Sequence, residues 1–303
     1  MAAGLGKRMY SKTPKILHTI LGKPIIQFVV DLAQTIGSSQ TVVVVGPNGH
    51  ELQRHLGRTV QYAVQSVPRG TGDAVHKGLA RTKHSHILIL SGDVPLLSRR
   101  TLQALIDEHY SESASLTFLT CRIHNPAGYG RIVRDRRGKV VKIVEDVDAT
   151  SAQKKINEIN AGIYLVKAEP LRSALQRVTV NNRQGEYYLT DIIRVFLKRR
   201  EKVIGYVIPD ENEIIGINTK TELARVRDLI KNRWYAELMK RGVWIEDPAT
   251  TTIDLSVKIG ENVRIRPYTM LEGRTRIPDG QILGPFVWIR DNKPCGLVLE
   301  RKR

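Results

Sequence analysis

The chain has 303 residues, of which 41% are hydrophobic and 26% charged, a composition typical of globular proteins and sufficient for one large or two ordinary domains. No apolar run approaches the roughly 20 residues of a membrane span, and the N-terminus lacks the apolar core of a secretory signal, so we expect a soluble cytoplasmic protein. The two cysteines, Cys121 and Cys295, are too few for a disulfide framework or a cysteine metal cluster.

The net charge of +18 raises the question of nucleic-acid binding, because clustered Lys and Arg release counterions from phosphates. The basic residues occur in short scattered groups, at 134–137, 198–200 and 301–303, and the aromatic content is only 6%. This distribution argues against a nucleic-acid function and is consistent with small anionic substrates.

The first predicted element is a basic, glycine-rich loop at the N-terminus. Gly4 and Gly6 stand among the cations Lys7, Arg8 and Lys15. Small residues let successive backbone N–H groups point into one concavity, where they bind phosphate oxygens, and the cations neutralise a triphosphate. The loop therefore predicts a site for a nucleoside triphosphate.

Helical and strand patterns alternate after the loop. Ile26, Val29, Val30 and Ala33 follow the spacing of one helical face. Apolar runs rich in β-branched residues predict buried strands at 41–45, 87–90, 116–120, 162–166 and 203–208. This alternation predicts an α/β, Rossmann-like fold with a mostly parallel sheet. The segments 131–133 and 139–144 are predicted instead to form an antiparallel hairpin that walls a substrate pocket.

The pattern changes in the last third of the chain. A helix predicted over 221–239 is followed by apolar residues at a strict period of six, which are Ile253, Ile259, Ile265, Leu271, Ile277, Leu283 and Ile289. A hexapeptide repeat of this kind predicts the short strands of a parallel β-helix. We therefore expect three segments: a nucleotide-binding domain at 1–220, a connecting helix at 221–243 and a β-helix stub at 244–303.

Asp93 is a candidate metal ligand. It follows the strand predicted at 87–90, at the carboxyl end where open α/β sheets bind their ligands. A carboxylate here suits Mg²⁺, which binds few protein oxygens and keeps phosphates and water. Asp93 could equally cap a turn before Pro95.

Eight motifs occur in order along the chain. They occupy 2–9, Gln65 with 70–74, 91–96, 128–132, 143–145, 158–162, 185–191 and 216–218. Together they make the chain resemble the sugar-1-phosphate nucleotidylyltransferases, and within that family the uridylyltransferase part of the enzymes that form UDP-N-acetylglucosamine. The resemblance implies the nucleotide-diphospho-sugar transferase fold, followed by a short left-handed parallel β-helix.

The resemblance also implies roles for individual residues. Arg8 and Lys15 are the expected catalytic residues, which with Gly4 bind the triphosphate and stabilise the departing pyrophosphate. Asp93 and Asn218 are the expected Mg²⁺ ligands. The expected uridine pocket and sugar site comprise Ala3, Gln65, Gly70 and Thr71 for the nucleoside, and Gly130, Glu145 and Asn160 for the sugar.

The activity that this implies is transfer of uridylyl from UTP to N-acetylglucosamine-1-phosphate, giving UDP-N-acetylglucosamine and pyrophosphate for cell-wall (peptidoglycan) synthesis. Three alternatives stay open at this point. One is a nucleotidylyltransferase for another sugar-1-phosphate, such as glucose-1-phosphate, against which Asn160 and the motif at 185–191 argue. The others are an inactive nucleotide-binding or assembly protein, and a nucleic-acid binder that uses the +18 charge.

The chain departs from the family at both ends. The family has a buried strand directly before the glycine-rich loop, where this sequence has only Met1. Losing that strand would cost on the order of 10 kcal/mol of folding free energy. We therefore expect a working protein that begins about ten residues upstream. The resembled bifunctional enzymes continue into a long β-helix with acetyltransferase activity, which we do not expect here. We expect the stub to pack on a partner subunit, as in a homotrimer, or on the first domain.

Overall fold

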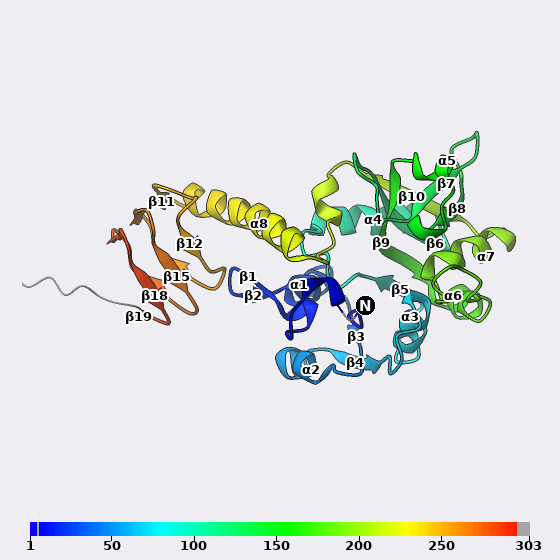
Figure 1. Ribbon diagram of the computed structural model, residues 1–303, viewed down its shortest axis with the longest axis horizontal. Helices are drawn as coiled ribbons and strands as arrows, with labels where there is room; N and C mark the ends of the chain where they lie inside the picture. Colours follow the sequence, from blue (N-terminus) through cyan, green and yellow to red (C-terminus); the bar gives the residue numbers. More distant parts are fainter. Residues whose placement is uncertain (5, 296–303) are drawn as a thin grey trace, which may run out of the picture. The chain divides into compact units, whose positions relative to one another are not determined.

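The computed structural model describes residues 1–4 and 6–295. The chain divides into two compact units, one built from residues 1–16 and 26–216 and the other from residues 17–25 and those from 217 onward (Figure 1). The α-helices are α1 (Ile25–Thr35), α2 (His50–Leu56), α3 (Thr71–Leu79), α4 (Arg99–Ser111), α5 (Ser151–Lys154), α6 (Ala168–Leu175), α7 (Ile192–Lys198) and α8 (Lys220–Lys240). None of the helices in the described part of the chain is long and apolar enough to cross a membrane.

The strands of the first unit are β3 (Val42–Val45), β4 (Gln61–Val64), β5 (His86–Ile89), β6 (Leu116–Arg122), β7 (Arg131–Arg134), β8 (Val140–Val144), β9 (Glu158–Lys167) and β10 (Val203–Ile208). The strands of the second unit are β1 (Thr19–Ile20), β2 (Lys23–Pro24), β11 (Trp244–Ile245), β12 (Thr252–Ile253), β13 (Lys258–Ile259), β14 (Arg264–Ile265), β15 (Met270–Glu272), β16 (Arg276–Ile277), β17 (Ile282–Leu283), β18 (Trp288–Arg290) and β19 (Lys293–Pro294).

The first unit is an α/β fold around a six-stranded sheet of order β10-β6-β9-β7-β8, in which β5 also pairs with β9. β6 and β10 are parallel, and β5 and β6 both run antiparallel to β9, so β5, β6 and β10 share one direction. β3 and β4 form a separate parallel pair. The predicted α/β class and the antiparallel hairpin are confirmed, the latter by Arg131 opposite Val144. The sequence did not predict β4 or the reversed direction of β9.

Two hydrophobic clusters cover opposite faces of this sheet, because successive side chains of a strand alternate between its faces. Along β6, Leu116 and Phe118 belong to a cluster with α6 and α7, whereas Leu119 and Cys121 belong to a cluster with α1 and α4. These side chains are fully buried. The sheet is thus the middle of three layers, and its inner strands are apolar on both faces, as strands covered by helices must be.

The second unit contains the hexapeptide repeat, which forms the predicted short parallel strands. β12 pairs with β15 and β15 with β18, all in parallel, so residues 18 apart stand beside each other, as Ile253 does beside Leu271 (Figure 1). Three strands therefore complete one coil. The repeat's isoleucines and leucines form one core with Tyr235 and Leu238 of α8. Helix α8 begins at a capping box formed by Thr219 and Glu222, which satisfies two N-terminal backbone donors.

The segment 17–25 packs on this coil within the second unit. Leu255 donates a backbone hydrogen bond to the carbonyl of Leu21 at 3.0 Å. Gly22 has a positive φ of 76°, and a Cβ at this position would lie 2.6 Å from Asp254 Oδ2. Glycine is therefore required here by both conformation and space. Gly22-Lys23-Pro24, a motif near the basic loop in sequence, thus serves as a β-turn that docks against the coil.

The N-terminal residues are held between two strands of the first unit. Ala2 donates a backbone hydrogen bond to the carbonyl of Val44 at 2.8 Å, and Met1 N donates to the carbonyl of Leu90 at 2.7 Å. Gly92 in turn donates to the carbonyl of Met1 at 2.8 Å. The start of the glycine-rich loop is therefore fixed from both sides, at the carboxyl ends of β3 and β5.

His109 is a titratable side chain buried in the first unit. It is 1% exposed, its Nδ1 lies 2.9 Å from Thr117 Oγ1, and its Nε2 has no partner among the described residues. Burial, helped by the positive charges of His86 and Lys167, lowers the pKa of His109 to about 4. The folded protein therefore keeps this imidazole neutral at pH values where the unfolded chain would protonate it.

We predict a loss of stability in mild acid that depends on His109. Since its pKa is lower in the folded state, the unfolded chain takes up the proton more readily, and the free energy of unfolding falls by about 3 kcal/mol as the pH drops from 7 to 4. His109→Gln should flatten this slope in urea unfolding at several pH values, and His84→Gln, at an exposed position, should not. Equal slopes for wild type and His109→Gln would contradict the assignment.

Candidate functional site

The glycine-rich loop presents an open backbone over a packed base. Gly4 is exposed, and a Cβ added to it would meet no atom within 4 Å. Gly6 has φ +60°, and its added Cβ would lie 2.7 Å from Lys15 Cβ. Met9, at the end of the 3₁₀ turn Lys7–Met9, is buried. The loop therefore folds closely over Lys15 while leaving space above Gly4 for a ligand.

Lys15 and Asp93 meet beneath this loop. Lys15 Nζ donates to Asp93 Oδ2 at 2.5 Å, and the two side chains are only 10% and 22% exposed. Asp93 follows β5, as predicted. Arg8 is exposed, and no ion pair or side-chain hydrogen bond joins it to any residue that the structure describes. The site thus offers an anion the exposed guanidinium of Arg8 and the largely buried ammonium of Lys15, which is bonded to Asp93.

The donor set around Asp93 fits a magnesium ion better than a metal that needs several protein ligands. No group of three or more His, Cys, Asp or Glu side chains lies together in the described residues. Mg²⁺ is commonly bound by one or two carboxylates with substrate phosphates and water. Asp93, with one oxygen already in contact with a cation, suits such a role.

Gln65, Gly70 and Thr71 lie together at the N-terminus of α3. Gln65 is 3% exposed, and its Nε2 donates to the carbonyl of Gly70 at 3.0 Å and to Asp73 Oδ2 at 2.8 Å. Thr71 Oγ1 accepts from the backbone N–H of Leu189 at 3.0 Å. Three of the residues predicted to bind uridine are therefore neighbours. The fourth, Ala3, lies beside the end of β3, where its carbonyl would be 3.1 Å from a Cβ on Gly46.

The three residues predicted to bind the sugar also lie together. The backbone N–H of Asn160 donates to the carbonyl of Gly130 at 2.9 Å, and a Cβ on Gly130 would lie 3.4 Å from Glu145 Oε2. Thr190 Oγ1 donates to Glu145 Oε1 at 2.8 Å. Burial raises the pKa of Glu145. The hydrogen bond from Thr190 lowers this pKa, and the negative charges of nearby aspartates, including Asp148, raise it further.

The side chain of Asn160 is held by its own strand. Its Nδ2 donates to the hydroxyl of Tyr164 at 2.7 Å, and its Oδ1 accepts from the backbone N–H of Gly162 at 3.1 Å. This fixes the amide in one orientation. The remaining predicted residue, Asn218, belongs to the second unit, where its backbone N–H donates to Glu222 Oε2 at 2.7 Å.

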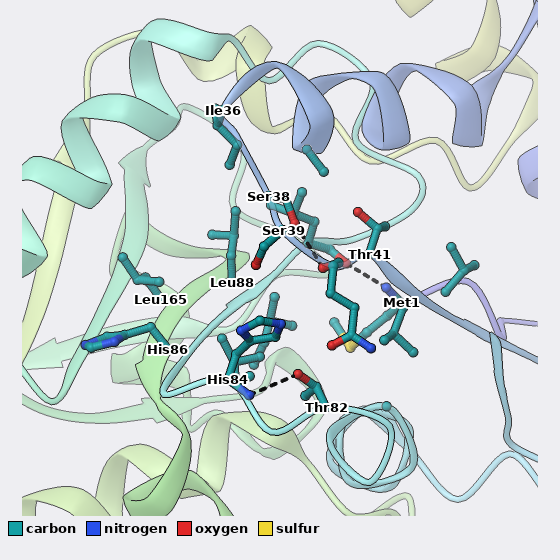
Figure 2. Close-up of a pocket in the computed structure, with 18 of the residues that line it drawn as sticks. Met1, Ile36, Ser38, Ser39, Thr41, Thr82, His84, His86, Leu88 and Leu165 are labelled. Carbon is teal, nitrogen blue, oxygen red and sulfur yellow. Dashed lines mark hydrogen bonds between the residues drawn. The ribbon is translucent and has the colours of Figure 1, made fainter. Parts of the chain in front are cut away.

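A separate cavity of about 470 Å³ adjoins the start of the loop (Figure 2). Met1, Leu88, Leu165 and Ile36 line it, together with the polar residues Thr41 and His84 among others. None of the lining residues is Lys, Arg, Asp or Glu. The cavity lacks the Lys and Arg side chains that neutralise a triphosphate, so the charged loop and not this cavity is the candidate site.

Residues 1–243 match the family described as Nucleotidyl transferase. The chain belongs to this family. The match spans all of the first unit, including the glycine-rich loop, Asp93 and the groups around Gln65 and Glu145, so the residues gathered in this site lie within the nucleotidyl transferase region.

Several curated nucleotidyl transferase relatives bear the name Bifunctional protein GlmU. The protein from Caldanaerobacter subterraneus subsp. tengcongensis is 43% identical over 293 residues, which is 96% of this chain. Those from Thermoanaerobacter pseudethanolicus and Halalkalibacterium halodurans are 42% and 39% identical, each over 97% of this chain. The chain spans 64–65% of the length of these three relatives.

Several contacts in the site were not assigned by the sequence analysis. Asp73 lies in the motif at 70–74 and Thr190 in the motif at 185–191. The bond between Asp73 and Gln65 spans 8 positions, and the bond between Thr190 and Glu145 spans 45. Tyr187 likewise accepts a hydrogen bond from Gly72 N–H at 2.7 Å. Aspartate is common in the first turn of a helix, because the helix dipole favours a negative charge there. The sequence therefore carried no signal that Asp73 bonds a glutamine.

We predict that Gly70→Ala destabilises the site. Gly70 has φ +105°, and an added Cβ would lie 2.6 Å from the backbone carbonyl oxygen of Tyr187, so the free energy of unfolding should fall by about 2–4 kcal/mol. Gly138→Ala is the matched control, because Gly138 has φ +76° but open space around its Cβ. Urea unfolding should separate the two, and equal losses would show that backbone conformation alone, without the clash, decides the effect.

Proposed function

We propose that the chain transfers the uridylyl group of UTP to N-acetylglucosamine-1-phosphate, giving UDP-N-acetylglucosamine and pyrophosphate. The observation that carries the proposal is the arrangement of Lys15 against Asp93 beneath the open backbone of Gly4, with exposed Arg8 beside them in the loop. The family match and the identity of about 40% to proteins named GlmU support it.

The chemistry proposed is a single in-line displacement. A phosphate oxygen of the sugar phosphate forms a bond to the α-phosphorus of UTP, and the bond from that phosphorus to the oxygen bridging the α- and β-phosphates breaks. The electron pair leaves with pyrophosphate, where Arg8 and Lys15 stabilise the added negative charge. The sugar phosphate is already ionised at neutral pH, so the site needs no general base.

Asp93 is the residue of the first unit that we propose to hold Mg²⁺. When bound, the ion would neutralise phosphate charge and polarise the phosphoryl oxygens. Since Asp93 Oδ2 accepts from Lys15 Nζ, an ion held by this carboxylate and the Lys15 ammonium would both lie beside the substrate phosphates. The second expected ligand, Asn218, stays a prediction from the sequence.

The sugar would be bound at the edge of the sheet formed by β7 to β9. Glu145 and the fixed amide of Asn160 provide acceptors and donors of the kind that bind hydroxyl and N-acetyl groups. Because burial raises the pKa of Glu145, its carboxyl group is more readily protonated than an exposed one. Gly130 packs beside Ile143 and Glu145, where an added Cβ would lie 3.0 Å from Ile143 Cγ2, so glycine lets this backbone lie close to the carboxylate.

The direct test is an assay with UTP, Mg²⁺ and a panel of sugar phosphates. We expect pyrophosphate release and formation of UDP-N-acetylglucosamine with N-acetylglucosamine-1-phosphate, and much slower release with glucose-1-phosphate. Chelation of the metal should stop the reaction and added Mg²⁺ restore it. Absence of turnover by a folded chain that binds UTP would reject the proposed activity.

We predict that Arg8→Ala lowers kcat/KM by 100-fold or more, about 3 kcal/mol, because it removes a full charge from the departing pyrophosphate. The variant should keep the wild-type melting temperature, since Arg8 is exposed and its side chain bonds none of the described residues. Arg100→Ala, an exposed arginine on α4, should change neither quantity. Wild-type turnover by Arg8→Ala would remove Arg8 from the mechanism.

A further inference from the structure

The orientation of the Gln65 amide is determined by two acceptors. Its Nε2 donates to the carbonyl of Gly70 at 3.0 Å and to the Asp73 carboxylate at 2.8 Å. Turning the amide by half a rotation would place Oε1 against both of these oxygens, which is repulsive. Since Gln65 is 3% exposed, water cannot readily replace the lost bonds.

The fixed orientation leaves two groups free to bind a ligand. Gln65 Oε1 accepts no hydrogen bond from any described residue, and the backbone N–H of Gly70 donates to none of them. The pair thus combines one acceptor with one donor. Uracil presents the complementary edge, since its N3–H donates and its O4 accepts. Cytosine presents the opposite edge, because its N3 accepts and its N4 amino group donates.

We infer that Asp73 is a positioning residue that sets the preference for uracil over cytosine. It does not touch the base; it acts through Gln65 by holding Oε1 as the acceptor. The inference rests on the proposed function, because it assumes that a pyrimidine nucleotide binds between Gln65 and Gly70. A charged acceptor makes the stronger of the two bonds to Nε2, so Asp73 contributes more to this orientation than the Gly70 carbonyl does.

A structural alternative exists for Asp73. It lies in the first turn of α3, where a carboxylate also interacts favourably with the helix dipole. Loss of that interaction would lower stability but would weaken the binding of UTP and CTP equally. The ratio of the two affinities therefore distinguishes positioning from helix stabilisation.

The test is equilibrium binding of UTP and CTP, without sugar phosphate, to the wild type and to Asp73→Ala by calorimetry. We expect the wild type to prefer UTP, and Asp73→Ala to reduce the ratio of affinities by about ten-fold, mainly through weaker UTP binding. Asp73→Asn keeps a neutral acceptor for Nε2 and should recover most of the ratio. If Asp73→Ala does not fold, Asp73→Ser, with a side chain too short to reach Gln65, should show the same loss.

Asp107→Ala is a matched control. Asp107 accepts from Gln103 Nε2 at 2.9 Å on the exposed face of α4, so this variant removes the same kind of bond far along the chain from Gln65. Its UTP to CTP ratio should equal that of the wild type.

The possible outcomes separate the two proposals. A wild type that prefers UTP, with an unchanged ratio in folded Asp73→Ala or Asp73→Ser, would overturn the role of Asp73 and leave the proposed function standing. A wild type that binds UTP no better than CTP, or binds neither, would overturn both. Normal uracil selection without turnover of the sugar phosphate would reject the proposed activity alone.

Discussion

The first unit depends on how residues 1 and 2 are held between two strands. Ala2 bonds the backbone of β3, and Met1 bonds the backbone on either side of Ser91 through Leu90 and Gly92. A Cβ on Gly92 would lie 2.7 Å from the carbonyl oxygen of Met1, so this approach requires glycine. Because the loop starts from this fixed point, its open backbone and Lys15 are brought to the carboxyl end of β5, where Asp93 lies.

The polar side chains of the site are ordered before any ligand binds. Gln65, Glu145 and Asn160 each have a partner within the first unit, which fixes the direction of their remaining donors and acceptors. Arg8 is the contrast, because it is exposed and its side chain bonds none of the described residues. Groups held in one orientation suit the recognition of a ligand, whereas the exposed Arg8 leaves a full positive charge accessible to an anion.

Sequence patterns predicted those parts of the fold that rest on periodicity. The period of six from Ile253 to Ile289 corresponds to strands that stack every 18 residues, and the β-branched runs correspond to β3, β5, β6 and β10. The reversed direction of β9 could not be predicted, because a buried strand is apolar on both faces whichever way it runs. Strand β4 was missed since only Ala63 of its four residues is buried.

The motifs and the resemblance that they carry predicted the residues of the candidate site one by one, but not the hydrogen bonds between them. Which acceptor fixes Gln65 and which hydroxyl bonds Glu145 depend on how α3 and the segment before α7 pack in space. Hydrogen bonds between residues distant in sequence leave no local pattern. Asp73, read from sequence alone, is an ordinary residue of a helix's first turn; the structure shows it in contact with the amide of Gln65.

A crystal structure of the chain with UTP and Mg²⁺ would test the central claim most directly. The account predicts phosphates against the backbone of Gly4 and the side chains of Arg8 and Lys15, with the uracil N3–H donating to Gln65 Oε1. Phosphates bound away from this loop, or a uracil ring distant from Gln65, would contradict it.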